Sequence, residues 1–210
     1  NGNILGTAFI WTNDLPTIGI GATGIGNIAS FTAINTSTVT EIATIFVTPN
    51  YTNAGLTCIG QPQDFTITIH PSALLISAGT TICSNNNVNL PITASVPSVI
   101  TWQANNNINV TGESLTLNSG TTITDFLVNQ GNVSEIVNYQ VAFVTTNFGC
   151  LSGPFNIPVT VQPLPDVQFV ELNTPFCHLD SIQFQNNTTG ANSYLWNFGD
   201  KSTSNNLTSP

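Results

Sequence analysis

The sequence predicts an all-β protein built from tandem β-sandwich repeats of about 92 residues each. The main evidence is a set of rare residues that recur with one spacing: Trp11, Trp102 and Trp196, Cys58 and Cys150, Cys83 and Cys177. The tryptophans are 91 and 94 residues apart, and the two cysteine pairs are 92 and 94 residues apart. A period of this size corresponds to one sandwich domain per repeat. The composition agrees, because a chain rich in Thr and Val, with 16 Gly, 12 Pro and no Met, disfavours long helices.

Alternating apolar and polar residues mark the strands. Residues 65–69 alternate and stop at Pro71, and residues 155–161 alternate and stop at Pro163, 92 residues later. Because Pro158 has no amide proton, we expect its strand to lie at a sheet edge or to carry a bulge. Further alternating pieces are Val88, Leu90 and Ile92, Leu115 and Leu117, Tyr139, Val141 and Phe143, and Ile182 and Phe184. Short, regularly spaced strands of this kind predict an Ig-like sandwich.

The same marks predict the domain boundaries. Residues 73–164 form one complete repeat, residues 1–72 a repeat that lacks its N-terminal strands, and residues 165–210 a repeat that lacks its C-terminal strands. Since the chain starts at Asn1 without a targeting segment, we expect it to be an internal part of a longer protein. The linkers are short and contain proline, which predicts a semi-rigid row of domains.

Charge excludes several classes of partner. The chain has ten Asp and Glu residues against a single Lys or Arg, Lys201, and a formal net charge of −9. Binding to nucleic acid or to an anionic membrane surface needs clustered basic residues, so neither partner is expected. The apolar runs are also far shorter than the roughly 20 residues that cross a bilayer, and no membrane insertion is expected.

The cysteine spacing predicts a disulfide between Cys83 and Cys150, which would stabilise the central repeat by roughly 4 kcal/mol. The partners of Cys58 and Cys177 would then lie outside the fragment. A Cys58–Cys177 pair and four free thiols are the alternatives. Cysteines paired at domain spacing are typical of oxidising compartments, so we expect the protein to be extracellular. The repeated tryptophan should pack in the core against the disulfide.

The residues around the third tryptophan resemble a known signature. Trp196, Phe198, Gly199 and Asp200 are similar to the WxFGDG motif of PKD domains, with Lys201 in place of the second glycine. The first and second repeats resemble PKD-like units, so the resemblance covers the whole chain. Long arrays of such units are typical of giant Bacteroidota cell-surface adhesins exported by the type 9 secretion system.

This resemblance implies a structural stalk or adhesive segment that serves gliding motility and surface attachment and has no enzymatic activity. The implied partners are neighbouring repeats, extracellular surfaces or glycans, and the surface motor or secretion machinery. Two other functions stay open: accessory modules of a secreted protease or polysaccharide-degrading enzyme, and a glycan-binding module that uses exposed aromatic rings. The equivalent positions of the tryptophans favour a role in the core over a binding platform.

Gly19, Gly21 and Gly24 spell the GxGxxG pattern of dinucleotide-binding proteins, and Glu41 follows at a suitable distance. That motif must open a helix, whereas residues 28–47 are rich in Ser, Thr, Ile and Val in strand-like order. The pattern is therefore interpreted as a glycine-rich bend between strands.

Two weaker motifs lie in the third repeat. Asp166, Asp180 and Asp200 are candidate ligands for Ca²⁺, as some PKD domains bind calcium near a domain junction. Ser181, between Asp180 and Ile182, resembles the O-glycan acceptor pattern of secreted Bacteroidota proteins. Solvated turns explain the same residues without a ligand.

Catalytic and zinc sites are not expected. His70 and His178 have no metal-ligating neighbours at suitable spacing. The sequence also has no GxSxG nucleophile motif, and a serine without a nearby base stays inert. We therefore expect no cofactor, apart from the candidate calcium ion.

Overall fold

The computed structural model describes residues 4–172, 175, 177, 182–189, 191, 193–197, 199, 203 and 204. Over this part of the chain the protein is all-β, which confirms the predicted fold class. A single turn of 3-10 helix, η1 (Pro16–Ile18), interrupts the strands, and the described residues contain no α-helix. Within these residues no helix has the length and apolar character needed to cross a membrane.

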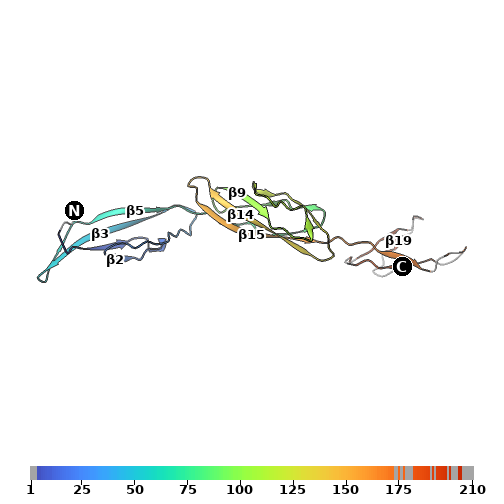
Figure 1. Ribbon diagram of the computed structural model, residues 1–210, viewed down its shortest axis with the longest axis horizontal. Coiled ribbons are helices and arrows are strands. Elements are labelled where there is room, and N and C mark those ends of the chain that lie inside the picture. Colours follow the sequence, from blue (N-terminus) through green and yellow to red (C-terminus); the bar gives the residue numbers. More distant parts are fainter. Residues whose placement is uncertain are drawn as a thin grey trace.

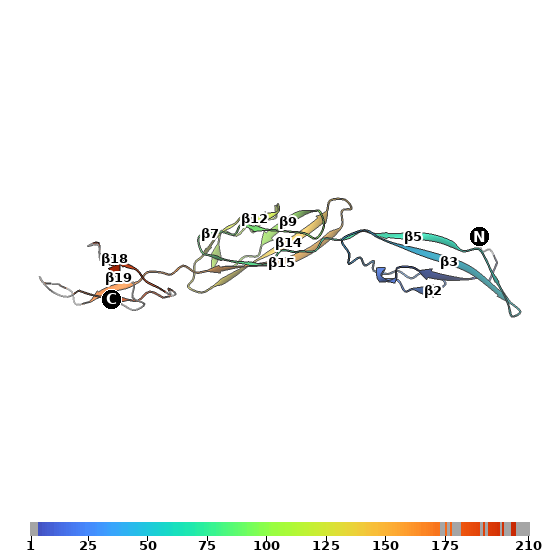
Figure 2. The same ribbon diagram turned by 180° about the vertical axis from the view of Figure 1, so that it is seen from behind.

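The strands fall into three groups that follow one another along a row (Figures 1 and 2). We call them the N-terminal segment (residues 4–72), the central segment (73–164) and the C-terminal segment (165–204). Among the described strands, every pairing joins two strands of the same segment. Short linkers around Pro71 and Pro163 connect the segments.

The N-terminal segment is one sheet with the order β2-β1-β3-β4, in which β5 also pairs with β3. Its strands are β1 (Ala8–Asn13), β2 (Thr23–Ile25), β3 (Glu41–Asn53), β4 (Leu56–Ile59) and β5 (Gln63–Ile69). β5 covers the alternating residues 65–69, as the sequence predicts. A small core lies on one face of this sheet: Trp11, Ile18, Ile20, Ala43 and Ile45.

The central segment is a two-layered sandwich. One layer is the five-stranded sheet β11-β9-β14-β15-β6, and the other consists of the sheet β10-β13-β7 and the pair β12-β8. The long strands are β9 (Ser98–Ala104), β14 (Glu135–Thr145) and β15 (Leu151–Gln162). The short ones are β6 (Thr80–Cys83), β7 (Asn86–Asn87), β8 (Leu90–Pro91), β10 (Val110–Thr111), β11 (Asn118–Ser119), β12 (Thr122–Ile123) and β13 (Phe126–Asn129). This arrangement is the Ig-like sandwich that the sequence predicts.

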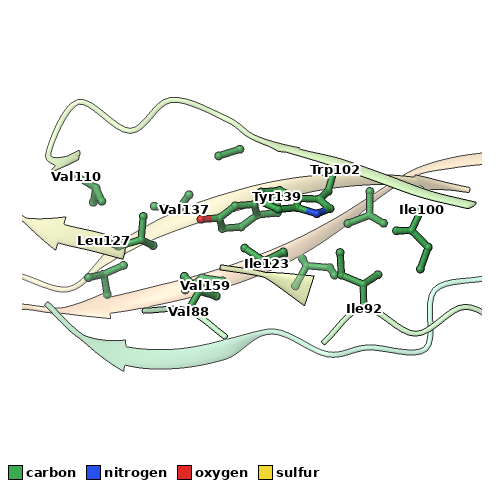
Figure 3. Close-up of a cluster of buried hydrophobic side chains, with 14 of the residues drawn as sticks. Val88, Ile92, Ile100, Trp102, Val110, Ile123, Leu127, Val137, Tyr139 and Val159 are labelled. Atoms are coloured by element: carbon green, nitrogen blue, oxygen red, sulfur yellow. The ribbon is translucent and has the colours of Figure 1, made fainter. Parts of the chain in front are cut away.

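The core of the sandwich forms because β14 and β15 alternate in burial. Val137, Tyr139, Val141 and Phe143 on β14 are buried on one face, while the residues between them are not. Figure 3 shows Trp102 and Tyr139 at the centre of this core, surrounded by aliphatic side chains from both layers. The indole of Trp102 meets the Tyr139 ring edge-on, with ring centroids 5.9 Å apart.

In the C-terminal segment, β16 (Phe169–Leu172) pairs with β17 (Gln183–Asn186), and β18 (Trp196–Asn197) pairs with β19 (Thr203–Ser204). Three aromatic rings join the two pairs. The Trp196 ring lies 5.6 Å from that of Phe169 and 5.9 Å from that of Phe184, measured between centroids. These contacts provide the packing that the structure describes in this segment.

Three details of the strand predictions can be compared with the structure. Of Val88, Leu90 and Ile92, only Leu90 lies in a strand, β8. Leu115 and Leu117 lie before β11 rather than in a strand, and both are exposed, so that prediction is wrong. Pro158 belongs to β15, which pairs with β14 along its length and with β6 only from Val159 onward. Pro158 thus lies just before the residues of β15 that pair with β6, and its missing amide proton interrupts no part of that pairing.

Candidate functional site

The central core contains a buried carboxylate that accepts three hydrogen bonds. Asp125 is 8% exposed and accepts hydrogen bonds from the Ser114 backbone N–H (2.8 Å), the Ser114 hydroxyl (2.7 Å) and the Tyr139 hydroxyl (2.8 Å). Tyr139 is fully buried between the layers. The carboxylate therefore ties the loop before β11 and the loop before β13 to the central strand β14.

This environment changes the acidity of the tyrosine. Burial, the hydrogen bond to Asp125 and the negative charges of Asp125 and Glu113 raise the pKa of the Tyr139 hydroxyl far above its ordinary value. A buried phenol that keeps its proton serves as a hydrogen-bond donor here. It lies in the core with its partner, so the pair has a structural role rather than a catalytic one.

The raised pKa makes the stability of the central segment depend on alkaline pH. In the unfolded chain the hydroxyl loses its proton near pH 10, whereas in the folded chain it does not. The contribution of this group to the free energy of unfolding is thus fully present below about pH 10. Above that pH it falls by about 1.4 kcal/mol per pH unit. Urea unfolding at pH 8 and pH 11 should show this loss in the parent protein and in Tyr51→Phe, but a smaller loss in Tyr139→Phe. An equal loss in all three proteins would contradict the assignment.

The tryptophans of the first two segments occupy equivalent places. Trp11 on β1 is 8% exposed and pairs with Val47 on the neighbouring strand β3, and Trp102 on β9 is 5% exposed and pairs with Val141 on β14. Trp196 is half-buried on β18 among the aromatic rings described above. Trp11 and Trp102 therefore pack in the cores, and their faces are not available to a ligand.

The predicted disulfide between Cys83 and Cys150 is wrong. Cys83 ends β6 and lies opposite Gln162 at the far end of β15, whereas Cys150 immediately precedes the start of β15. Twelve residues of extended chain separate Cys150 from Gln162, the neighbour of Cys83, and they span about 40 Å. A disulfide needs Cα atoms within about 7 Å of each other. Both residues carry free thiols, as does Cys58 on β4. Trp102 accordingly packs against Tyr139 and not against a disulfide.

The glycine motif begins in the connection between β1 and β2, as the sequence predicts, but its last glycine lies inside a strand. Gly19 follows η1 in a left-handed conformation, with φ of 106°, and Gly24 lies within the strand β2. Gly24 is opposite Trp11, and a β-carbon at this position would overlap the indole ring. The glycine is required because the tryptophan crosses the backbone of the neighbouring strand, and no phosphate site is needed to explain it.

Gly24→Ala should therefore displace Trp11 and destabilise the N-terminal segment by about 1–3 kcal/mol. Gly26→Ala is not a clean control because Gly26 has a positive φ of 78°. Gly21→Ala is better matched, since its nearest neighbour would be an ordinary contact at 3.7 Å. Thermal unfolding followed by tryptophan fluorescence measures both variants, and equal midpoints for the two would contradict the packing argument.

Several predicted site residues lie outside the described part of the chain. These are Asp180, Asp200 and Phe198, the O-glycan candidate Ser181, and His178. Asp166 is described and exposed, and its carboxylate accepts a hydrogen bond of 2.9 Å from the Gln168 side chain. Over the described residues no three His, Cys, Asp or Glu side chains gather as a metal site. The calcium and glycan hypotheses stay predictions.

The contact between the first two segments involves a residue that the sequence does not single out. The ring of His70, at the end of the N-terminal segment, stacks on Phe148 in the turn between β14 and β15, with centroids 3.6 Å apart and planes 5° from parallel. The Thr40 hydroxyl lies 3.1 Å from His70 Nδ1 and holds the imidazole in place. Phe148 is one of 12 phenylalanines, and only the fold shows that it lies at the junction.

The opposite end of the central segment meets the next linker. Gly131 and Asn132, in the loop before β14, line a groove together with residues 163–166 and Thr189. Residues of both the central and the C-terminal segment therefore line this groove. The turn with Phe148 thus packs against the preceding segment, and the loop with Gly131 lies beside the linker to the following one.

The fold agrees with a comparison to known families. Residues 80–165, from β6 to the linker after β15, match a family described as PKD-like domain. A search among curated proteins found no match. PKD-like domains are typically non-catalytic extracellular modules. The match supports a PKD-like Ig fold for the central segment, which is the part of the chain with the complete sandwich.

Proposed function

We propose that this chain is a stalk segment of a large secreted cell-surface adhesin, in which successive sandwich domains provide reach. The observation that carries the proposal is the row of three strand groups joined by short proline-containing linkers (Figure 2). A proline linker of a few residues limits the angles between neighbouring domains. A row of this kind separates its two ends more efficiently than a compact fold of the same length.

The surface chemistry suits a spacer. A single Lys or Arg in 210 residues leaves few sites for trypsin-like proteases, and the net charge of −9 opposes association between copies. The hydrogen-bonded carboxylate in the core is remote from solvent and has a structural role. A PKD-like domain is also consistent with an extracellular structural or adhesive module.

The finer proposal concerns the cell. We infer that the parent protein is exported to the cell surface by the type 9 secretion system, that a surface motor carries it, and that it attaches the cell to its substratum during gliding. The segment itself acts as a spacer between the anchored part and the gripping part. Trp11 and Trp102 are buried, so a glycan platform would have to use other aromatic rings.

Small-angle X-ray scattering tests the extended shape. A compact protein of 210 residues has a radius of gyration of roughly 17 Å, and an extended row should give about twice that value. Pro71→Gly with Pro163→Gly should broaden the distribution of interatomic distances, because glycine linkers are more flexible. A radius of gyration near the compact value for the parent chain would contradict the stalk.

Immunolabelling tests the location. Antibodies raised against residues 73–164 should label intact cells of the source organism without permeabilisation. Labelling that requires permeabilised cells would contradict a surface protein. Because the segment is proposed to act as a spacer, deleting it from the parent protein should reduce cell attachment while export continues.

A further inference from the structure

The two cysteines of the central segment mark its two ends. Cys150 lies in the turn between β14 and β15, where its N–H donates to the Thr145 hydroxyl at 2.9 Å and its carbonyl accepts from the Thr145 N–H at 3.0 Å. Cys83 lies at the opposite end, beside Gln162, and the following residue, Ser84, donates its N–H to the Gln162 carbonyl at 2.8 Å. These hydrogen bonds hold the backbone at Cys150 and directly after Cys83 in place.

The junction between the first two segments shows what each end meets. The last residue before the Pro71 linker, His70, stacks on Phe148 in the turn that leads to Cys150. Figure 1 shows the turn of the β14–β15 hairpin next to the end of β5. The entry turn of one domain thus packs against the final residue of the domain before it.

The repeat period relates this junction to the next one. Pro71 and Pro163 are 92 residues apart, so Gln162 is the equivalent of His70. In the central segment the strand beside Gln162 carries Cys83. A complete domain placed before another therefore has a cysteine beside the residue that is equivalent to His70, whose ring contacts the Phe148 turn. That turn contains Cys150, two residues from the stacked ring.

The cysteines recur with the same period as the fold. Cys58 precedes Cys150 by 92 residues, and Cys83 precedes Cys177 by 94. One cysteine position belongs to the entry end of a domain and the other to its exit end. Only neighbouring domains bring one of each together, since within a single domain the length of β15 separates them.

We propose that the cysteines form disulfides between consecutive repeats, with the Cys83 position of one repeat joined to the Cys150 position of the next. Two thiols lose two protons and two electrons as the S–S bond forms. A disulfide such as oxidised glutathione accepts them and is reduced to two thiols. Each linker would then be accompanied by a second covalent connection between the two domains. This proposal does not depend on what the array binds.

The test uses the whole chain with its complete repeat duplicated: residues 1–164 followed by residues 73–210. In this chain Leu164 takes the place of Ser72 before the second copy. The first variant keeps Cys83 of the first copy and Cys150 of the second and has serine at the other four cysteines. After oxidation with glutathione disulfide, the monomer should lose both free thiols, and peptide mapping should recover the linked pair.

The matched control keeps Cys150 of the first copy and Cys83 of the second, again with serine elsewhere. Its composition is identical, but its two thiols lie at the outer ends of the duplicated unit and should stay free. Far-UV circular dichroism of both reduced proteins shows whether they fold alike. Free thiols in the first variant, or equal oxidation of the two, would overturn the proposal.

A second variant tests the junction without duplication. In the 210-residue chain with Cys58→Ser, Cys83→Ser and Cys177→Ser, the substitution His70→Cys places a thiol at the contact with the Phe148 turn. A short bis-maleimide should then join residue 70 to Cys150 within one molecule. Ser72→Cys in the same background should react less, and equal crosslinking or none at residue 70 would overturn the junction geometry.

Discussion

Trp102→Ala should destabilise the central segment by about 3–5 kcal/mol, because it removes the largest side chain from a closed core. Trp102 lies on β9 between β11 and β14, and its ring meets Tyr139 edge-on. Aliphatic side chains of both layers surround the ring (Figure 3), and we expect them to fill the cavity left by its loss only in part. Urea unfolding followed by far-UV circular dichroism should show an earlier transition for this segment.

Val99→Ala is the matched control, because Val99 lies on the same strand but is 53% exposed. We expect this variant to lose less than about 1 kcal/mol. Similar losses in the two variants would mean that Trp102 does not fill the core. Hydrogen exchange should add that protection falls throughout β9 and β14 in Trp102→Ala and not in Val99→Ala.

Asp125→Ala should cost about 3–5 kcal/mol, since it leaves buried donors without an acceptor. The Ser114 N–H, the Ser114 hydroxyl and the Tyr139 hydroxyl all lose the same carboxylate. Urea unfolding measures the loss of stability. Amide hydrogen exchange at Ser114 should accelerate most, because that N–H donates to the deleted group.

The control for this prediction is the tyrosine itself. Tyr139→Phe keeps the ring in the core and removes one of the three donors, so it should cost about 1 kcal/mol. In Asp125→Ala the same tyrosine substitution should cost less, because the hydroxyl no longer has its acceptor. Equal costs of Tyr139→Phe in the two backgrounds would contradict the hydrogen bond between these side chains.

The long strands were predictable because burial on one face leaves a period of two in the sequence. β5, β14 and β15 each show this alternation, and each lies where the pattern places it. Most of the other strands in the central segment are only two residues long, as in β10 and β11. A strand of two residues is too short to show a period. The alternation of Leu115 and Leu117 therefore predicts a strand at residues that lie just before one.

The cysteine spacing was informative about the repeat but not about the pairing. A constant separation shows that two residues occupy equivalent places in successive domains. It does not show whether they lie at the same end of a domain. That depends on the parallel pairing of β6 with β15, which brings Cys83 to Gln162 and away from Cys150. Pairing between distant strands left no local signal in the sequence.

The hydrogen-bonded cluster of Asp125, Ser114 and Tyr139 was also not predictable from the sequence. Asp125 is one of ten scattered acidic residues, and neither its neighbours nor its spacing distinguishes it from a solvated carboxylate. Its burial follows from the close approach of the loops before β11 and β13 to Tyr139. The same holds for Phe148, whose role depends on the position of His70 in the preceding segment.

The parallel pairing of β6 with β15 determines how the central domain responds when its two ends are pulled apart. Tension enters through the chain before β6 and leaves through the end of β15, so the two strands are drawn in opposite directions along their length. Four successive residue pairs, from Thr80 with Val159 to Cys83 with Gln162, then bear the load together in shear. A hairpin opened from its free end would instead yield one pair at a time.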